Sequence, residues 1–332
     1  MKKKIAFIGL SQRTLSLTLP VILCNKDYDV CTVISEFYLE NAREIINLHS
    51  VKIYNYIDSD CFESVDMIFV SAYPKHLKDI LKKLRRLNFQ GKIIVDTPVI
   101  EISILGLMRF MLNPLYKDIE CLEILPFSQI FNKLYQDENF EKSNKAYVIN
   151  FNSFFNYHGI ALARKILRLK SNSEVVYYKN KENTMATLKN LSLSSNFGMV
   201  HYYNSSMKSK KKHFFALLLD EECVVFRKGA AINISFVQNF INDLNLIASH
   251  KKIKYRFIDY HDDRQQALNR FLSNLEKYGK VYSAYDNCYD IYLDLISKFR
   301  HTFIRYIFFK IGNIFFKYLI YRNDRRTKKN LF

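Results

Sequence analysis

The sequence lacks several features that would assign it to a familiar class at once. Its six cysteines are widely spaced and include no Cys-x-x-Cys pair, which argues against a zinc site or a disulfide framework. No helix-turn-helix, RNP or zinc-finger pattern is present, although the net charge is +18. Such a charge predicts attraction to an anionic partner, namely nucleic acid, acidic lipid or a phosphorylated substrate. Without a recognition motif, however, we expect no nucleic-acid partner, and we expect no metal site.

Proline and long apolar runs are also scarce. All five prolines lie at or before Pro126 of the 332 residues.

The basic N-terminus, MKKKIAFIGL, has too short an apolar run for a signal peptide and leads directly into a glycine, as a first strand would. The cysteines are typical of small core residues in a reducing compartment. We therefore expect a cytoplasmic protein, and a hydrophobic content of 49% is sufficient for a full core.

Up to about residue 122, strand and helix patterns alternate. Strands are predicted over 4–9, 28–35, 51–56, 66–72 and 91–96. Helices are predicted from about 12, where Pro20 should kink or shorten the helix, and over 37–48 and 75–87. This alternation predicts a doubly wound parallel sheet with helices on both faces, which is the Rossmann architecture.

The pattern changes after Pro126. Longer strands are predicted over 146–151, 174–179, 191–203 and 214–227, with turns at Gly198 and at 208–212. With one helix over 159–169, they predict a mostly antiparallel sheet, and helical periodicity returns over 263–298. The predicted fold class is α/β: an N-terminal Rossmann domain (1–122), a C-terminal α+β domain with an open antiparallel sheet (123–298), and a basic tail (299–332).

The segment from Lys4 to Thr14 indicates a phosphate-binding turn. A dinucleotide fingerprint needs glycine at three places, and only the first is kept, as Gly9. Ser11 and Thr14 stand in the other two places. The helix N-terminus offers free N–H groups to a pyrophosphate, and Arg13 could add a charge pair. The alternative is a plain strand–helix turn in which Ser11 is the N-cap.

The order of these segments resembles the Gfo/Idh/MocA oxidoreductases over about residues 3–298. The family's fourth strand and following helix match Asp66 to His76, and its Glu-Lys-Pro matches Asp96-Thr97-Pro98. Its Asp-x-x-x-His pattern falls on Phe154 to His158, and its late helix pair resembles 267–295. The resemblance implies NAD or NADP as cofactor, a sugar or nucleotide-sugar substrate, and His158 as the catalytic acid–base group, assisted by Tyr157. The cofactor-binding residues that it and the turn imply are Gly9, Ser11, Gln12, Arg13, Ser35, Ala72, Tyr73, His76, Thr97 and Pro98.

Three departures from the family bear on this function. Thr97 replaces the family's lysine and Phe154 its aspartate. Ser35 stands where the family often has an acid for the ribose hydroxyls, which favours NADP over NAD. For His158 a capping or core role is equally open, and His76 is also explained as a helix-start residue.

Two functions from different classes follow. The first is a divergent NAD(P)-dependent oxidoreductase acting on a sugar or sugar nucleotide in bacterial surface-polysaccharide biosynthesis. The alternative is a non-redox Rossmann-fold protein that binds a nucleotide sugar or a partner enzyme. A third hypothesis is a membrane-recruiting scaffold that uses only the tail and the basic surface.

The tail itself has an amphipathic pattern. Residues 303–321 are apolar apart from a stripe of Arg305, Lys310, Asn313 and Lys317, and a basic segment follows up to Lys329. This predicts an interfacial helix that holds the protein at an anionic membrane, the inner face of the cytoplasmic membrane. The alternative is a helix buried against a second subunit in a homo-oligomer.

Overall fold

The computed structural model describes most of the N-terminal half and separate parts of the remainder. Described are residues 2–35, 51–142, 146–151, 156–168, 176–180, 197–202, 214–220, 222–228, 253–260, 263–296, 307, 311–312, 314–316 and 318. The helix predicted over 37–48 lies outside them. The chain forms two compact units, and the domain limits expected above stay predictions. The first unit comprises Met1–Ile124, Arg264–Tyr292 and Ile311–Phe332, and the second comprises Leu125–Asp263 and Leu293–Lys310.

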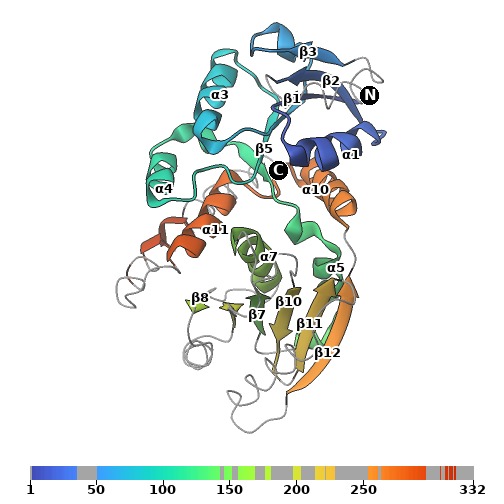
Figure 1. Ribbon diagram of the computed structural model, residues 1–332, viewed down its shortest axis with the longest axis vertical. Helices are drawn as coiled ribbons and strands as arrows, with labels where there is room; N and C mark the ends of the chain where they lie inside the picture. Colours follow the sequence, from blue (N-terminus) through green and yellow to red (C-terminus); the bar gives the residue numbers. More distant parts are fainter. Residues whose placement is uncertain are drawn as a thin grey trace. The chain divides into compact units, whose positions relative to one another are not determined.

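The first unit is built on a six-stranded parallel sheet (Figure 1). The strands are β1 (Lys3–Ile8), β2 (Tyr28–Ile34), β3 (Lys52–Tyr54), β4 (Met67–Val70), β5 (Lys92–Asp96) and β6 (Ile119–Leu122). Their order is β3-β2-β1-β4-β5-β6, and every pair is parallel. The Rossmann architecture is therefore confirmed. The sequence did not predict β6, whose short run includes the charged but buried Glu120.

The first helix passes through Pro20 and ends at Leu23, and the kink expected there stays a prediction. It begins at Gln12, widens into a π-helical segment η1 (Thr14–Thr18), and continues as α1 (Leu19–Leu23). Proline has no N–H with which to bond the preceding turn. Just before Pro20, the backbone N–H of Leu19 bonds the carbonyl of Thr14, five residues back. The helix α10 (Arg264–Tyr278) packs against η1 and α1.

Two further helices connect β4, β5 and β6, which lie on the side of β1 opposite β2 and β3. The helix α3 (Pro74–Arg86) joins β4 to β5, and α4 (Ile104–Met111) joins β5 to β6. Because crossovers between parallel strands are right-handed, successive crossovers in one direction place both helices on the same face of the sheet. Both also contact the short turn η3 (Pro114–Tyr116). Phe110 of α4 packs edge-on against Tyr285 of α11 (Ala284–Ile296).

A carboxyl group is buried where β6 meets the start of this last helix. Glu120 is 4% exposed. Its Oε2 accepts hydrogen bonds from the backbone N–H groups of Val281 (2.9 Å) and Tyr282 (3.0 Å). Burial raises the pKa of Glu120 to about 7, although the two backbone bonds oppose the shift by favouring the charged form. The stability of this unit should therefore depend on pH near neutrality.

The second unit contains a mixed six-stranded sheet. Its strands are β7 (Ala146–Phe151), β8 (Val176–Asn180), β9 (Phe197–Tyr202), β10 (Phe214–Leu218), β11 (Glu222–Lys228) and β12 (Lys254–Tyr260), in the order β12-β11-β10-β7-β9-β8. The fold class is confirmed, but the prediction of an antiparallel sheet needs correction. Only β10 runs antiparallel to its neighbours, and the other three pairs are parallel.

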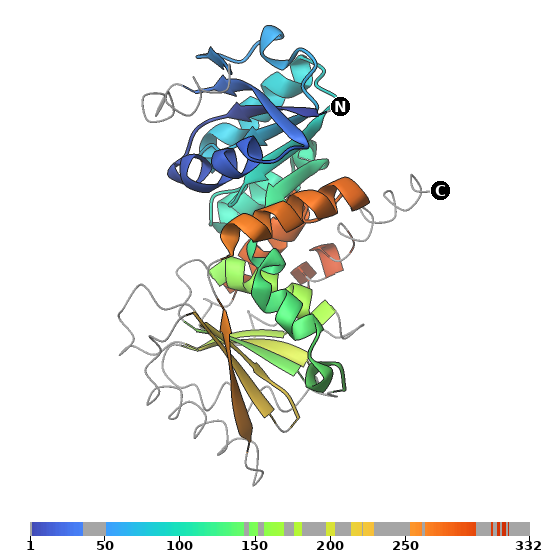
Figure 2. The ribbon, with the colours of Figure 1, turned by 90° about the vertical axis from the view of Figure 1, so that its right-hand side faces the viewer.

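The correction has a physical reason. Strand periodicity is the same in both orientations, whereas orientation is set by the connections, and parallel neighbours need a crossover. Here α7 (Asn156–Arg168) follows β7 and packs against β7 and β9, and Figure 2 shows it across one face of the sheet. Gly198 lies inside β9 and is not a turn. The single strand predicted over 214–227 is a hairpin, closed by the N–H of Leu219 bonding the carbonyl of Glu222.

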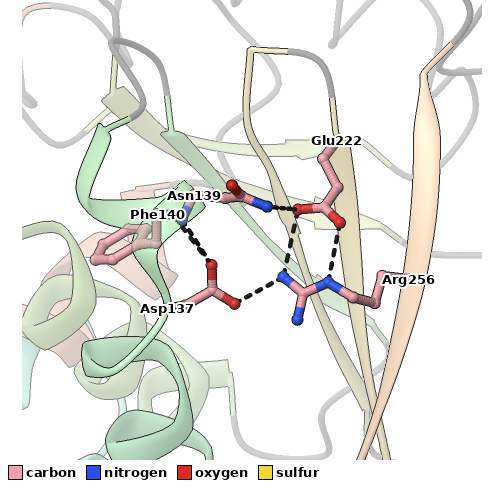
Figure 3. Close-up of polar contacts among 5 residues, drawn as sticks. All are labelled: Asp137, Asn139, Phe140, Glu222 and Arg256. Atoms are coloured by element: carbon pink, nitrogen blue, oxygen red, sulfur yellow. Dashed lines mark hydrogen bonds and ion pairs between the residues drawn. The ribbon is translucent and has the colours of Figure 1, made fainter.

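A charged network ties β12 to its neighbours in this unit (Figure 3). Arg256 Nε lies 2.9 Å from Glu222 Oε1, and its Nη2 lies 2.7 Å from Asp137 Oδ2. Asn139 Nδ2 also donates to Glu222, and Asp137 accepts the backbone N–H groups of Asn139 and Phe140. Asp137 thereby caps α6 (Glu138–Lys142), which follows α5 (Gln129–Tyr135). One guanidinium connects two strands and a helix start.

Candidate functional site

A cavity of about 940 Å³ opens at the carboxyl edge of the parallel sheet. It lies where the strand order reverses, because the chain leaves β1 toward β2 on one side and leaves β4 toward β5 on the other. Ligands bind at this switch point in open α/β sheets. The lining residues all belong to the first unit: Ile8, Gly9, Leu10, Ser11, Gln12, Ile34, Ser35, Asn55, Tyr56, Ile57, Ser71, Ala72, Tyr73, Pro74, Lys75, His76, Asp79, Ile80, Lys83, Asp96, Thr97 and Pro98.

The turn after β1 requires glycine. Gly9 has a φ of +81°, and a Cβ at this position would lie 2.2 Å from the carbonyl oxygen of Ser71. Both the backbone conformation and the space therefore exclude a side chain. The N–H of Gly9 donates to the carbonyl of Ile34, and the N–H of Ser71 donates to the carbonyl of Ile8. These bonds extend the strand register into the turn and fix its position in the cavity wall.

Ser11 caps the helix, as the sequence predicted. Its Oγ accepts a hydrogen bond from the backbone N–H of Thr14 (3.2 Å) and from the hydroxyl of Ser71 (2.7 Å). The Oγ atoms of Ser11 and Thr14 lie 3.0 Å apart. The N–H groups of Gln12 and Arg13, in the first helical turn, have no acceptor within a helix. The cap and an anion site are thus compatible, because the serine accepts the N–H of Thr14 and intrahelical bonds do not use those of Gln12 and Arg13.

Arg13 is already paired. Its Nη1 lies 2.9 Å from Asp96 Oδ1, and its Nη2 donates to the carbonyl of Leu122 at 3.2 Å. Of the cofactor residues expected from the sequence, Arg13 alone does not line the cavity, whereas its partner Asp96 does. Arg13 therefore bears on the cavity through Asp96, whose negative charge it neutralises. A direct bond from Arg13 to a phosphate stays a prediction.

Thr97 contributes an unsatisfied hydroxyl. Its backbone N–H donates to Asp96 Oδ1 at 3.1 Å. Its Oγ1 is buried and has no hydrogen-bond partner among the described residues. Buried hydroxyls nearly always have a partner, and Thr97 and Pro98 both line the cavity. The residue that replaces the family's lysine thus offers one free hydrogen-bonding group to a ligand.

The remaining predicted cofactor residues follow β2 and β4. Ser35 comes directly after β2, and its N–H donates to the carbonyl of Tyr54. Ala72 and Tyr73 precede α3, and Tyr73 is 77% exposed. The N–H of His76 donates to the carbonyl of Tyr73, as expected of a helix-start residue. All four line the cavity, while their part in binding stays a prediction.

Sequence reasoning missed several lining residues: Asn55, Tyr56, Asp79 and Lys83. The first two follow β3, the strand beside β2. The sequence predicted a strand over 51–56, which includes both residues, so only the observed end of β3 at Tyr54 places them at the edge of the sheet where ligands bind. Asp79 and Lys83 lie further along α3 and carried no local signal.

The predicted catalytic residues lie in the second unit, in the first turn of α7. The rings of Tyr157 and His158 pack with centroids 4.1 Å apart. Tyr157 is 2% exposed, as for a core residue, and His158 is half-buried. The histidine thus occupies the helix start that the sequence indicated. Its acid–base role stays a prediction.

The described part of the tail is helical and has two unlike faces. Phe316 is buried, with its ring centroid 5.4 Å from that of Tyr289 and 5.3 Å from that of Tyr292. Ile311, Ile314 and Tyr318 are 61%, 72% and 58% exposed. The predicted polar stripe and the basic end lie outside the described residues. Among those described, no helix combines the length and apolar character needed to cross a bilayer.

Comparison with known proteins supports the fold. A family model described as NADP oxidoreductase, coenzyme F420-dependent, matches residues 4–99. A search of curated proteins finds no match. Among solved structures, a myo-inositol dehydrogenase from Corynebacterium glutamicum matches with a TM-score of 0.57 and 11% identity, over 90% of this chain and 96% of that chain.

Two other structures match equally well. A putative myo-inositol dehydrogenase from Sinorhizobium meliloti has a TM-score of 0.57 and 10% identity, over 89% of this chain and 96% of that chain. A probable dehydrogenase from Thermotoga maritima has a TM-score of 0.57 and 11% identity, over 89% of this chain and 95% of that chain. The resemblance to the Gfo/Idh/MocA architecture is thus confirmed at the level of the fold.

Proposed function

We propose that this chain is an NAD(P)-dependent oxidoreductase acting on a sugar or sugar nucleotide. One observation carries the proposal: the cavity at the switch point of the sheet is bounded by a glycine turn and a helix N-terminus. That combination suits a pyrophosphate, because free N–H groups and the positive end of the helix dipole converge on it. The NADP family model over residues 4–99 and the inositol dehydrogenases that share the fold support the same assignment.

The residues present fit a dinucleotide. At position 9 the backbone has a φ of +81°, and a Cβ there would clash with the carbonyl oxygen of Ser71, so the turn keeps the first glycine that a dinucleotide fingerprint needs. The N–H groups of Gln12 and Arg13 would hold the pyrophosphate, and the buried hydroxyl of Thr97 would bond the far end of the cofactor. When bound, the nicotinamide ring accepts or supplies the hydride that interconverts a carbinol and a carbonyl.

The cavity wall favours NADP. Ser35 follows β2 where an acid would repel a 2′-phosphate. Lys75 and Lys83 add positive charge to the lining, against the single carboxylate of Asp79 on the same helix. We therefore expect NADPH to bind more tightly than NADH.

Titration calorimetry tests this assignment. Full-length protein is titrated with NADPH, NADH, and UDP-glucose as a representative nucleotide sugar. Micromolar binding of NADPH, weaker binding of NADH, and sugar-dependent turnover would support the oxidoreductase. If neither NADPH nor NADH binds, the oxidoreductase assignment is wrong.

A second function is favoured by Thr97. A threonine hydroxyl does not titrate near neutrality, so it is a poor general acid–base group in place of the lysine that the resemblance puts there. On this reading the cavity holds a nucleotide sugar and the hydride chemistry is lost. Binding of UDP-glucose with no binding of NADPH would support the alternative and exclude the first proposal.

The biological setting is part of the proposal. We place the protein in bacterial surface-polysaccharide biosynthesis at the inner face of the membrane. Three features are consistent with this setting: the sugar substrates of the Gfo/Idh/MocA oxidoreductases that the chain resembles, the net charge of +18, and the basic tail. The exposed Ile311, Ile314 and Tyr318 supply the apolar face that an interfacial helix needs. A contact with a second subunit is the alternative, and analytical ultracentrifugation of full-length protein distinguishes a monomer from a homo-oligomer.

A further inference from the structure

The helix α4 exposes the side that a surface helix normally makes polar. Its buried residues are Gly106, Leu107 and Phe110. Its exposed side carries Ile104, Leu105, Met108, Met111 and the adjoining Leu112, with exposed fractions of 54%, 54%, 55%, 46% and 84%. Isolated apolar residues are normal on a surface, but a contiguous set marks an interaction site. This set follows helical spacing and therefore forms one face.

The helix α3 supplies the opposite chemistry. It carries six cationic side chains and one carboxylate, Asp79. Lys75 and Lys83 line the cavity and are accounted for by a phosphate-bearing ligand. Four exposed cations do not line it: Lys78, Lys82, Arg85 and Arg86. They are positive charge beyond what the cavity uses.

The two helices belong to one surface. Both follow crossovers in the same direction along the sheet, from β4 to β5 and from β5 to β6, and so cover the same face. Both contact η3, and Figure 1 shows them at the same side of the first unit. An apolar helix face and a cationic helix are therefore neighbours on a single body.

We propose that this surface, formed by α3 and α4, docks the protein on an anionic lipid bilayer. The α4 side chains enter the boundary between headgroups and acyl chains, where apolar burial drives binding. The α3 cations lie over anionic headgroups, which adds affinity that salt weakens. The surface is formed by residues of α3 and α4 and does not depend on which ligand the cavity takes.

A lipid fits this surface better than two other occupants. In an isologous dimer through α4, symmetry would bring two cationic α3 helices into one interface, where like charges repel. Nucleic acid would pair with the cations, but it offers no apolar phase for five aliphatic and methionine side chains. A bilayer with acidic headgroups satisfies both halves of the surface.

Vesicle sedimentation tests the proposal with full-length protein. Vesicles of phosphatidylcholine alone are compared with vesicles of phosphatidylcholine and phosphatidylglycerol in equal parts, at low and high salt. We expect binding to the acidic vesicles only, reduced by salt. The triple variant Leu105→Gln, Met108→Gln, Met111→Gln should weaken the partition coefficient by at least about tenfold, since it removes most of the inserted apolar area.

Two matched variants separate the contributions. Lys78→Gln with Arg85→Gln should weaken binding to acidic vesicles by about 30-fold and flatten the salt dependence, because each cation near an anionic leaflet contributes about a fivefold factor. Tyr278→Gln, an exposed aromatic at the end of α10, should change nothing.

Three outcomes would overturn the proposal. One is equal binding of wild type and the α4 variant while Ile311→Gln with Ile314→Gln releases the protein, which would assign binding to the tail alone. Another is a concentration-dependent dimer that the α4 variant abolishes, which would make the surface a contact between copies. The third is retention on RNA, but not on acidic vesicles, that is lost in the α3 variant. Circular dichroism and urea unfolding verify that each variant is folded.

Discussion

Arg13 and Asp96 form an ion pair of 2.9 Å that joins the first helical turn to the end of β5. Asp96 lines the cavity and Arg13 does not. The pair therefore keeps a carboxylate beside the proposed phosphate site neutralised, and the arginine acts on a ligand through its partner.

This relationship predicts the behaviour of two variants. Arg13→Gln should weaken NADPH binding by about tenfold, because the negative charge of Asp96 then repels the phosphates without the guanidinium beside it. Adding Asp96→Asn should restore most of the affinity. If Arg13 instead bonds the phosphate directly, the double variant stays as weak as the single one, and titration calorimetry distinguishes the two results.

Gly9→Ala should destabilise the first unit by more than the left-handed backbone alone requires. That backbone costs a residue with a Cβ about 1–2 kcal/mol, and here the added methyl also meets Ser71 at 2.2 Å. Gly279→Ala is the matched control, since Gly279 has a φ of +73° with nothing within 4 Å of its added Cβ. In urea unfolding, Gly9→Ala should lower the free energy of unfolding clearly more than Gly279→Ala does. Equal losses would contradict the close approach of Gly9 to Ser71.

Glu120→Gln should stabilise the protein at alkaline pH. The pKa of Glu120 is about 7 in the fold against an ordinary 4.5, so the folded state favours the neutral acid. The resulting stability is full below 4.5 and is lost as the pH rises through 7, which amounts to about 3 kcal/mol. A glutamine stays neutral and still accepts the N–H groups of Val281 and Tyr282.

The measurement is urea unfolding of both proteins at about pH 5 and about pH 8, where linkage predicts a growing advantage for the variant. The exposed Glu63→Gln controls for the loss of one negative charge. A stability difference between wild type and Glu120→Gln that does not change with pH would contradict the buried carboxyl.

Arg256→Met should destabilise the second unit by about 1–2 kcal/mol, because Asp137 and Glu222 lose their shared cation. Asp137 is 9% exposed and cannot be rehydrated easily, while the 39% exposure of Arg256 reduces the effect through solvent screening. Lys254→Met removes an exposed cation from the same strand and should change the unfolding free energy little. Similar losses in the two variants would indicate a general charge effect.

His158→Ala should lower the turnover of an active enzyme by about 100-fold or more while leaving cofactor affinity unchanged, as expected when a positioned acid–base group is lost. Unchanged turnover would make His158 a structural residue beside Tyr157.

Local sequence was sufficient for the elements and for the turn. The apolar runs of β1, β4 and β5, the glycine that ends the first strand and the serine cap all depend on residues within a few positions of one another. Each depends on backbone conformation or on a hydrogen bond between residues close in sequence, so a short segment is enough to predict it. The cavity residues after β1, β2, β4 and β5 follow from the same rule, because parallel strands end at one edge.

Only the tertiary structure decided which residues meet across the chain. The pairing of Arg13 with Asp96, the return of α10 to the first sheet and the parallel neighbours in the second sheet all join distant segments. Periodicity does not encode such pairings, since they depend on connections and on packing. The apolar run of α4 is likewise compatible with a buried helix or an exposed one. Its surface is exposed because one helix face suffices to cover the sheet, and Gly106, Leu107 and Phe110 already provide it.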